Sequence, residues 1–408
     1  MSAALRRSFN SLEVPNYRRY FVGQMISLSG TWMQTVAAIW LILSLTGSGV
    51  AVGATTALQF LPMLLFGAWG GLLADRISKR RLLIATQTLM AIPAIGLLAV
   101  TATGIVAPWM VFLAVFLMGL VNAVDNPTRQ SFVIEMVGPD RVVNAVSLNS
   151  VIVQSARIVG PALAGLLIAG FGVVPCFAIN ALTFVAMIFA LWSMDPRGLR
   201  TEPVAPRERG AIRAGLRYVA RTPELAVSLA LMALVGTLGF NFQVVLPLLA
   251  KFSFDGGAMT YGVLVSAMAV GSIVGALVNG AHGRTGPALI AGGALAFGIC
   301  ALLSAAMPTL ALEIPVLAGL GAAAVTFAAT INSTLQLAVA PEMRGRVMAL
   351  YSVVFLGSTP IGGPLVGWLS QAYDPRVALL LAGISGLSAA WAARVSFARL
   401  SRAQAIPA

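Results

Sequence analysis

Long apolar stretches alternate with short polar links along almost the whole chain. A helix needs about 20 consecutive apolar residues to cross a hydrocarbon core about 30 Å thick, and these stretches have that length. Links such as Thr46-Gly47-Ser48 and Met307-Pro308-Thr309 are short and turn-like, so adjacent helices should run antiparallel. The pattern predicts an all-α integral membrane protein with twelve spans, at residues 20–45, 50–72, 82–102, 108–130, 143–169, 175–193, 225–249, 259–279, 288–306, 310–334, 347–371 and 377–395.

The composition agrees with a chain that is solvated mainly by lipid. Of its 408 residues 59% are hydrophobic and only 10% are charged, whereas a soluble domain carries about 25% charged residues. The N-terminal segment before the first span is polar, so we expect no cleavable signal peptide and insertion directed by the first span itself.

The formal net charge of +13 raises the question of a nucleic-acid partner. Nearly all basic residues fall in the ends and links that lie on one side of the predicted topology. Only Lys251 and Arg376 fall in links of the other side, and only Arg157 lies well inside a span. The positive-inside rule therefore predicts a protein of the bacterial inner membrane with both termini on the cytoplasmic side. Membrane topology thus explains the positive net charge without a nucleic-acid partner.

The spans divide into two related halves. Val137-Gly138-Pro139-Asp140 precedes span five as Val339-Ala340-Pro341-Glu342 precedes span eleven, and a Gly-Pro pair follows each at a matching depth. We therefore expect a duplication of six helices plus six. The predicted parts are an N-terminal half at 1–193, a cytoplasmic linker at 194–224 and a C-terminal half at 225–408.

The linker carries seven arginines, and its second part has the pattern of a basic amphipathic helix. Residues Arg209, Arg213, Leu216, Arg217 and Val219 form that pattern. Two interpretations stay open: a helix on the inner leaflet, and a solvated tether that only obeys the charge rule.

The link after span two places one acid, Asp75, inside a basic cluster. Gly71 precedes it, and Arg76, Lys79 and Arg80 follow it. A carboxylate among cations can dock in one conformation and be released in another, which is the chemistry of a gate. The alternative is an ordinary inner-leaflet anchor.

Span five contains the second motif. Gly160, Pro161 and Gly165 combine small residues with a proline, a pattern that favours a kinked and tightly packed helix.

Both motifs resemble signatures of the major facilitator superfamily. The first is similar to the superfamily's loop signature, with Ser78 in place of a glycine, and the second to its antiporter signature, with Ala156 and Ala164 in place of glycines. Further short matches, including Leu246-Pro247, resemble the branch of enterobactin-exporter-like and macrolide-efflux-like carriers. The resemblance implies the major facilitator fold of two pseudo-symmetric six-helix bundles, alternating access with a gate at Asp75, and export.

Three charged residues inside or at the edge of spans are candidates for proton coupling: Asp125, Arg157 and Glu313. Asp125 and Arg157 should lie at similar depths and pair, while Arg129 competes for Asp125 from one turn away. The pair is either a proton-exchange site or a permanent structural bridge. Glu313 either takes up protons or only complements the helix dipole at the start of its span.

A solute path needs sparse polar groups in an apolar wall. Trp32, Phe240 and Phe242 are candidates for that wall. Each polar candidate is either a substrate contact or a hydrogen-bond partner of a neighbouring helix: Gln34, Gln59, Asn122, Gln154, Asn241 and Gln243.

Several classes of function lack their motifs. Neither Lys79 nor Lys251 follows glycine as in a phosphate-binding loop, and one histidine with two distant cysteines makes no zinc site. We expect no cofactor, no metal and no enzyme activity. The sequence predicts a monomeric, proton-driven exporter of small amphipathic compounds such as drugs or siderophores. The alternatives are an uptake symporter and a non-transporting membrane receptor or enzyme.

Overall fold

The computed structural model describes residues 10–200, 211–282 and 285–404, and every regular element within these ranges is a helix. Twelve segments of this described part are long and apolar enough to cross a membrane, which confirms the predicted number of spans. Proline opens several of them, among them Pro108, Pro223 and Pro287, because its missing N–H is not needed in the first turn. Gly47 ends the first span in the left-handed conformation, with φ of 61°.

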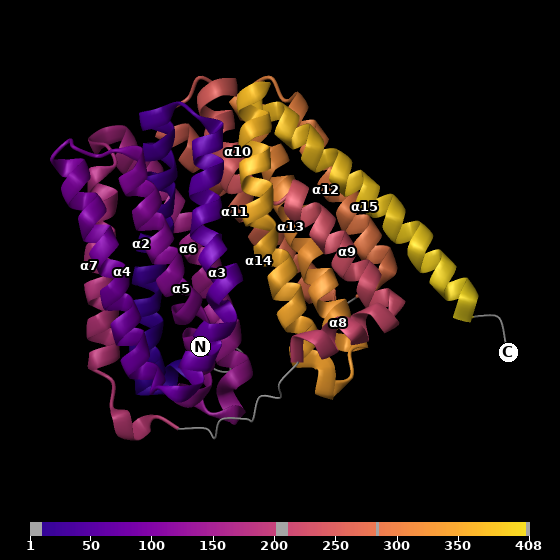
Figure 1. Ribbon diagram of the computed structural model, residues 1–408, viewed down its shortest axis with the longest axis horizontal. Helices are drawn as coiled ribbons and strands as arrows, with labels where there is room; N and C mark the ends of the chain where they lie inside the picture. The colour runs from indigo at the N-terminus through magenta and orange to yellow at the C-terminus, as the bar shows by residue number, and fades with distance from the viewer. Residues whose placement is uncertain (1–9, 201–210, 283–284, 405–408) are drawn as a thin grey trace. The chain divides into compact units, whose positions relative to one another are not determined.

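Contacts divide the described chain into two compact units. In Figure 1 the first is coloured from indigo to magenta and the second from magenta to yellow, apart from its segment Ser48–Ala57, which is indigo. The first unit contains α2 (Pro15–Thr46), most of α3 (Gly49–Arg76), α4 (Lys79–Ala102), α5 (Pro108–Val137), α6 (Val142–Phe171) and α7 (Val174–Trp192). The second unit contains α8 (Ala211–Arg221), α9 (Pro223–Leu238), α10 (Phe242–Leu248), η4 (Leu249–Ser253), α11 (Ala258–His282), α12 (Pro287–Ala306), α13 (Leu310–Ala338), α14 (Pro341–Ala372) and α15 (Pro375–Gln404).

An aromatic and aliphatic cluster forms the core at one end of the first unit. Tyr17, Tyr20 and Phe132 are fully buried there, and Tyr20 meets Phe132 edge to face with ring centroids 6.0 Å apart. The Tyr17 hydroxyl donates to the Ala145 carbonyl oxygen at 2.8 Å, so α2 is tied to α6. The cluster fixes the level at which the helices carrying the polar residues meet.

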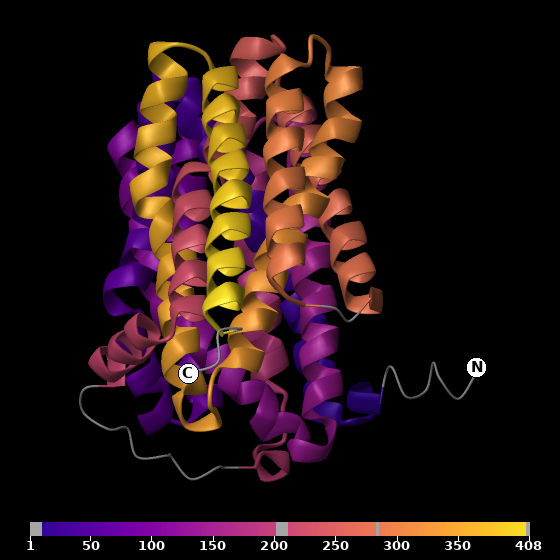
Figure 2. The ribbon, with the colours of Figure 1, turned by 90° about the vertical axis from the view of Figure 1, so that its right-hand side faces the viewer.

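Glycines bring the helices of the second unit into backbone contact. Gly298 of α12 lies against the backbone of Gly383 and Gly386 in α15, the two helices that run side by side in Figures 1 and 2. Gly271 of α11 lies against the Ala318 carbonyl of α13 in the same way. Small residues allow such approaches in a membrane, where the hydrophobic effect does not drive helices together.

The second unit also includes Ser48–Ala57, the first turns of α3. Gly49 and Gly53 of this segment lie against the backbone of Gly367 and Gly363 in α14, so that no side chain separates the two helices. The Ser48 hydroxyl donates to Oε1 of Gln371 at 2.7 Å and fixes the same crossing.

The seventh span is not the continuous helix that the apolar pattern predicts over 225–249. It breaks after α9 and resumes with α10, and it ends in a π-helical turn, η4. The reason lies in the side chain of Asn241, whose amide donates to the Thr237 carbonyl oxygen at 2.7 Å and so occupies an acceptor of the helix backbone. Broken spans of this kind place backbone polar groups inside a membrane protein.

The predicted amphipathic helix in the second part of the linker is present as α8. Leu216 and Arg217 are exposed and Val219 is buried, while Gly215 packs against Arg346 and Leu350 of α14. Arg209 and the side chain of Arg213 lie outside the described residues. Within the described part, α8 is therefore attached to the second unit.

We expect the glycine contacts to dominate helix packing in the second unit. Gly271→Ala should lower the midpoint of thermal unfolding in detergent, because a methyl group there overlaps the Ala318 carbonyl. Gly292→Ala is the matched control, since it also lies in a helix but meets nothing within 4 Å and should be neutral or stabilising by about 0.5–1 kcal/mol. Equal midpoints for the two variants would contradict this account of the packing.

Candidate functional site

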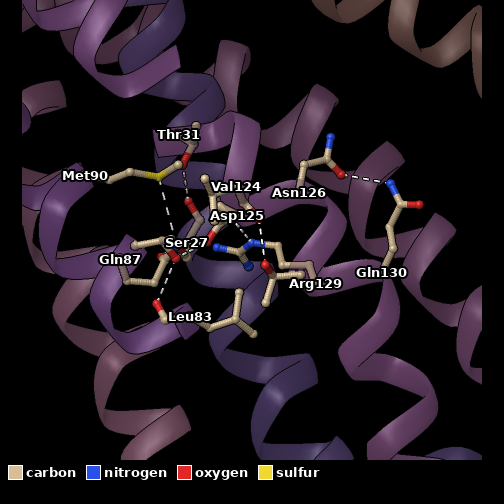
Figure 3. A network of polar contacts seen from close by, with 12 residues as sticks. Ser27, Thr31, Leu83, Gln87, Met90, Val124, Asp125, Asn126, Arg129 and Gln130 are labelled. Atoms are coloured by element: carbon tan, nitrogen blue, oxygen red, sulfur yellow. Dashed lines mark hydrogen bonds and ion pairs between the residues drawn. The ribbon is translucent and has the colours of Figure 1, made fainter. Parts of the chain in front are cut away.

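The first unit contains a buried polar network around Asp125 of α5 (Figure 3). Asp125 is only 2% exposed. On α4, the Thr86 hydroxyl donates to its Oδ1 at 2.6 Å and the Gln87 amide donates to the same atom at 2.9 Å, while Nε of Arg129 donates to Oδ2. The carboxylate thus accepts three hydrogen bonds, one of them from a cation.

The network extends to a third helix. Ser27 of α2 donates to Oε1 of Gln87 at 3.4 Å, so that α2, α4 and α5 are joined at one level, as Figure 3 shows. Nη1 of Arg129 is buried and has no hydrogen-bond partner among the described residues. A buried guanidinium with one free donor is costly in this surrounding, and the pair with Asp125 is what compensates its charge.

Of the two partners that the sequence offers to Asp125, the structure selects Arg129 and not Arg157. Arg129 lies four residues after Asp125 on the same helix, so the two side chains meet without any movement of the backbone. Arg157 lies on α6, with its guanidinium carbon 5.0 Å from the centre of the Trp32 ring. The expected pair between Asp125 and Arg157 is therefore corrected.

Two cations of the predicted gate are engaged within the first unit. Lys79 forms an ion pair with Glu135 of α5, with side chains 14% and 10% exposed. Arg80 donates to the carbonyl oxygens of Leu191 and Trp192 at 2.7 Å each and so caps the end of α7. Sequence reasoning missed Glu135; the signal was an acid near the end of span four, close in the chain to basic links.

The rest of the predicted gate lies in the last turns of α3. Gly71 is half-buried and Arg76 is exposed, while the side chain of Asp75 lies outside the described part of the structure. Gly70, one residue earlier, lies against the Ala123 carbonyl of α5. The gating role of Asp75 stays a prediction.

The antiporter-like motif packs α6 tightly against α2. A methyl group on Gly160 would stand 2.7 Å from Cβ of Trp32 and 2.8 Å from the Ser29 carbonyl oxygen, so only glycine fits without displacement. Pro161 and Gly165 are also buried. The close packing predicted for this segment is present.

The six polar candidates for a solute path fall into two groups. Gln34 and Asn241 are each 2% exposed, and the side-chain amide of each donates a hydrogen bond to another residue of the protein. Gln34 accepts from the Asn180 amide of α7 and donates to the Met118 sulfur of α5 at 2.9 Å, so it serves the contact between helices. The half-buried candidates are Gln59, Asn122, Gln154 and Gln243.

The broken seventh span carries an aromatic cluster beside these groups. Phe240, at the break, lies edge to face with Phe297, Phe327 and Phe355 at centroid distances of 5.3, 6.4 and 6.3 Å. The side-chain oxygens of Asn241 and Gln243 are buried there without a hydrogen-bond partner among the described residues. The phenylalanine rings and the two unpaired acceptor oxygens together have the composition expected of a site that contacts a solute.

Glu313 is fully buried in the second unit, in the first turn of α13. Ser304 of α12 donates to its Oε1, and its Oε2 has no hydrogen-bond partner among the described residues. No salt bridge reaches it within the described chain, although the charge of Arg376 acts on it from a longer distance. Unlike Asp125, this carboxyl is left with one bare oxygen and no adjacent cation.

The chain matches one protein family over almost its full length. The family model described as transmembrane secretion effector covers residues 7–407. The sequence is 26% identical over 385 residues to the enterobactin exporter EntS of Salmonella typhimurium, covering 90% of this chain and 89% of that protein. It is 23% identical over 349 residues to macrolide efflux protein A of Streptococcus pyogenes, covering 84% and 86%.

A further relative is matched over a shorter length. The staphyloferrin A transporter of Staphylococcus aureus is 24% identical over 261 residues, which are 64% of this chain and 65%, just under two thirds, of that protein. Among solved structures, the nucleoside transporter NupG superposes with a TM-score of 0.73 at 16% identity, covering 94% of this chain and 99% of that one. This likeness confirms the fold predicted from the spans.

We expect the pair of Asp125 and Arg129 to stabilise the first unit. Arg129→Gln leaves a buried carboxylate without its cation and should cost about 3–5 kcal/mol of unfolding free energy. Adding Asp125→Asn should restore part of that loss, because no uncompensated charge then remains. The measurement is a double-mutant cycle by thermal unfolding in detergent.

The exposed Arg76 supplies the matched control, since Arg76→Gln removes the same charge without breaking a buried pair. Additive effects of Asp125→Asn and Arg129→Gln would show that the two residues do not act as a unit.

Proposed function

The chain belongs to the transmembrane secretion effector family of major facilitator transporters, and from this premise we propose that it is a proton-driven exporter of small amphipathic compounds such as drugs or siderophores. It is a multi-pass membrane transporter and not an enzyme. The proposal of export rests mainly on sequence similarity to a macrolide efflux protein over 84% of the chain and to an enterobactin exporter over 90% of the chain.

The similarity of a segment of α6 to the antiporter signature supports the direction of transport that we propose. Gly160 belongs to the segment similar to the antiporter signature, and its closeness to Trp32 and Ser29 leaves no room for a side chain. A segment packed this closely holds two helices of one unit rigid while other contacts change. The competing function on the same fold is an uptake symporter, which the accumulation experiment below separates from export.

We propose Glu313 as the group that exchanges the proton. A charged carboxylate with one unpartnered oxygen in an apolar surrounding is costly, and binding a proton removes the charge. Asp125 is the weaker candidate, because Thr86, Gln87 and Arg129 already saturate it, as expected of a structural bridge. Arg157, the third candidate for coupling, has no carboxylate partner among the described residues.

The gate that we propose uses Asp75 and Arg76 at the end of α3. Lys79 and Arg80 are held by Glu135 and by the end of α7, so they form its fixed part. Asp75 docks in one state and is released in the other, and this change accompanies alternating access.

We further propose that the protein acts as a monomer in the bacterial inner membrane with both termini in the cytoplasm. The concentration of basic residues in the termini and in the links on one side supports this orientation.

We expect expression in a pump-deficient host to lower the accumulation of compounds from a panel that includes a macrolide and a catecholate siderophore. A protonophore should abolish the difference, because it removes the driving gradient. Asp75→Asn should raise accumulation again. If expression instead raises the uptake of a nutrient, the uptake alternative replaces export, and if no compound responds to any gradient the transport proposal fails.

Within the same experiment, Glu313→Gln separates coupling from gating. The amide keeps the bond to Ser304 but cannot exchange a proton, so efflux against a gradient should be lost at unchanged expression. Asp255→Asn is the matched control, since Asp255 is exposed and asparagine tolerates its φ of 48°. Full efflux by Glu313→Gln would remove Glu313 from the coupling mechanism.

A further inference from the structure

Arg157 is a cation in the middle of the membrane-spanning part of α6. It lies at the midpoint of the span Asn144–Phe171, and its side chain is exposed. Apart from its position over the Trp32 ring, no hydrogen bond or ion pair engages it among the described residues. An unpaired charge at this depth is costly unless water or a ligand reaches it.

Arg157 does not lie on the apolar side that α6 exposes in the second half of its span. In the second half of the span, the large apolar residues Val159, Leu163 and Leu166 are exposed by 43%, 45% and 57% and form an apolar side of the helix. At about 100° per residue, Arg157 points roughly opposite to them. Its guanidinium is therefore turned away from that apolar side, in an exposed position that water and solute can reach.

Arg157 also cannot reach the membrane surface. From the midpoint of its span, either end is about 20 Å away at 1.5 Å per residue, which is far beyond the length of an arginine side chain. Arginines near helix ends usually extend their side chains to the lipid headgroups, and Arg157 is too far from either end to do so.

Two neighbours complete a site on the same unit. Trp32 of α2 supports one face of the guanidinium at 5.0 Å and leaves its N–H groups free to donate. Gln154, about one turn before Arg157, is half-buried and adds an amide that is not engaged in any hydrogen bond seen within the described chain. The site thus combines a cation from Arg157, a neutral hydrogen-bond donor from Gln154 and the indole of Trp32. Such a combination suits an aromatic compound that carries a carboxylate or phenolate group.

We propose that Arg157, supported by Trp32 and flanked by Gln154, binds the anionic group of the transported solute, so that the substrates are amphipathic organic anions. The proposal rests on the proposed function, since it assigns the substrate class of the same exporter. Within the site, Arg157 forms the ion pair with the solute, Gln154 donates a second hydrogen bond, and Trp32 holds the guanidinium in position.

The test uses three probes of similar size that share the naphthalene ring: 2-naphthoate, 2-naphthalenemethanol and 2-naphthylmethylammonium. Binding to the purified full chain in phosphatidylcholine nanodiscs is measured by equilibrium dialysis. The wild type should bind naphthoate at least about tenfold more tightly than the alcohol or the ammonium compound, the gain expected of one charge-assisted hydrogen bond. R157Q should remove that preference, R157K should keep part of it, and R217Q should keep all of it, because Arg217 is exposed on α8.

Equal affinity of the wild type and R157Q for naphthoate, or a preference of the wild type for the ammonium compound, would overturn the proposal. If R157Q does not fold, Trp32→Phe and Gln154→Leu decide: weaker binding of naphthoate with unchanged binding of the alcohol supports the site, and unchanged binding of both overturns it. This outcome can be distinguished from that of the accumulation experiment. If cationic compounds are exported but naphthoate does not bind, export is supported and the proposed anion site is wrong. If naphthoate binds through Arg157 but no compound is exported, the site is supported and the export function is wrong.

Discussion

The absence of water from the hydrocarbon core is the constraint on which this structure depends. Each backbone group must be bonded within the protein, and each buried charge needs a partner there. Asp125 meets this requirement fully, with Thr86 and Gln87 from α4 and Arg129 from its own helix. The helices must also pack closely without a hydrophobic driving force between them, and glycines such as Gly160 and Gly298 allow this because they carry no side chain at the helix contact.

The exceptions to this constraint are the places where we locate function. Glu313 keeps one oxygen without a partner, Arg157 keeps its guanidinium free above Trp32, and Asn241 keeps a bare acceptor at the break of the seventh span. Groups of this kind are expensive to maintain in a membrane protein, and a transported solute or proton supplies the missing partner. The two units differ here: the described part of the first holds a carboxylate paired with a cation and a second, exposed cation, and that of the second holds a buried carboxyl without an adjacent cation.

The sequence predicted the features that follow from local chemistry. Apolar stretches gave the twelve spans, and the small residues around Gly160 gave the close packing of α6. The expected pair of Asp125 with Arg157 was wrong, because the partner of Asp125 depends on the direction in which α6 turns Arg157, and hydropathy and spacing do not determine that direction. Glu135 escaped notice for a similar reason, since its pairing with Lys79 joins the first turn of α4 to the last turn of α5, and the two residues are 56 positions apart in the chain. The break near Asn241 was not predicted, because the hydropathy of a segment does not reveal that an asparagine amide donates to a backbone carbonyl of the helix.

The central claim is that solute movement is coupled to protons through these unsatisfied groups. The most direct measurement reconstitutes the purified chain in proteoliposomes that contain a pH-sensitive dye and adds a compound whose cellular accumulation the chain lowers. The account predicts that the compound drives protons across the membrane in the opposite direction and that Glu313→Gln abolishes this flux. Movement of the compound at the same rate without a pH gradient and without proton flux would contradict it.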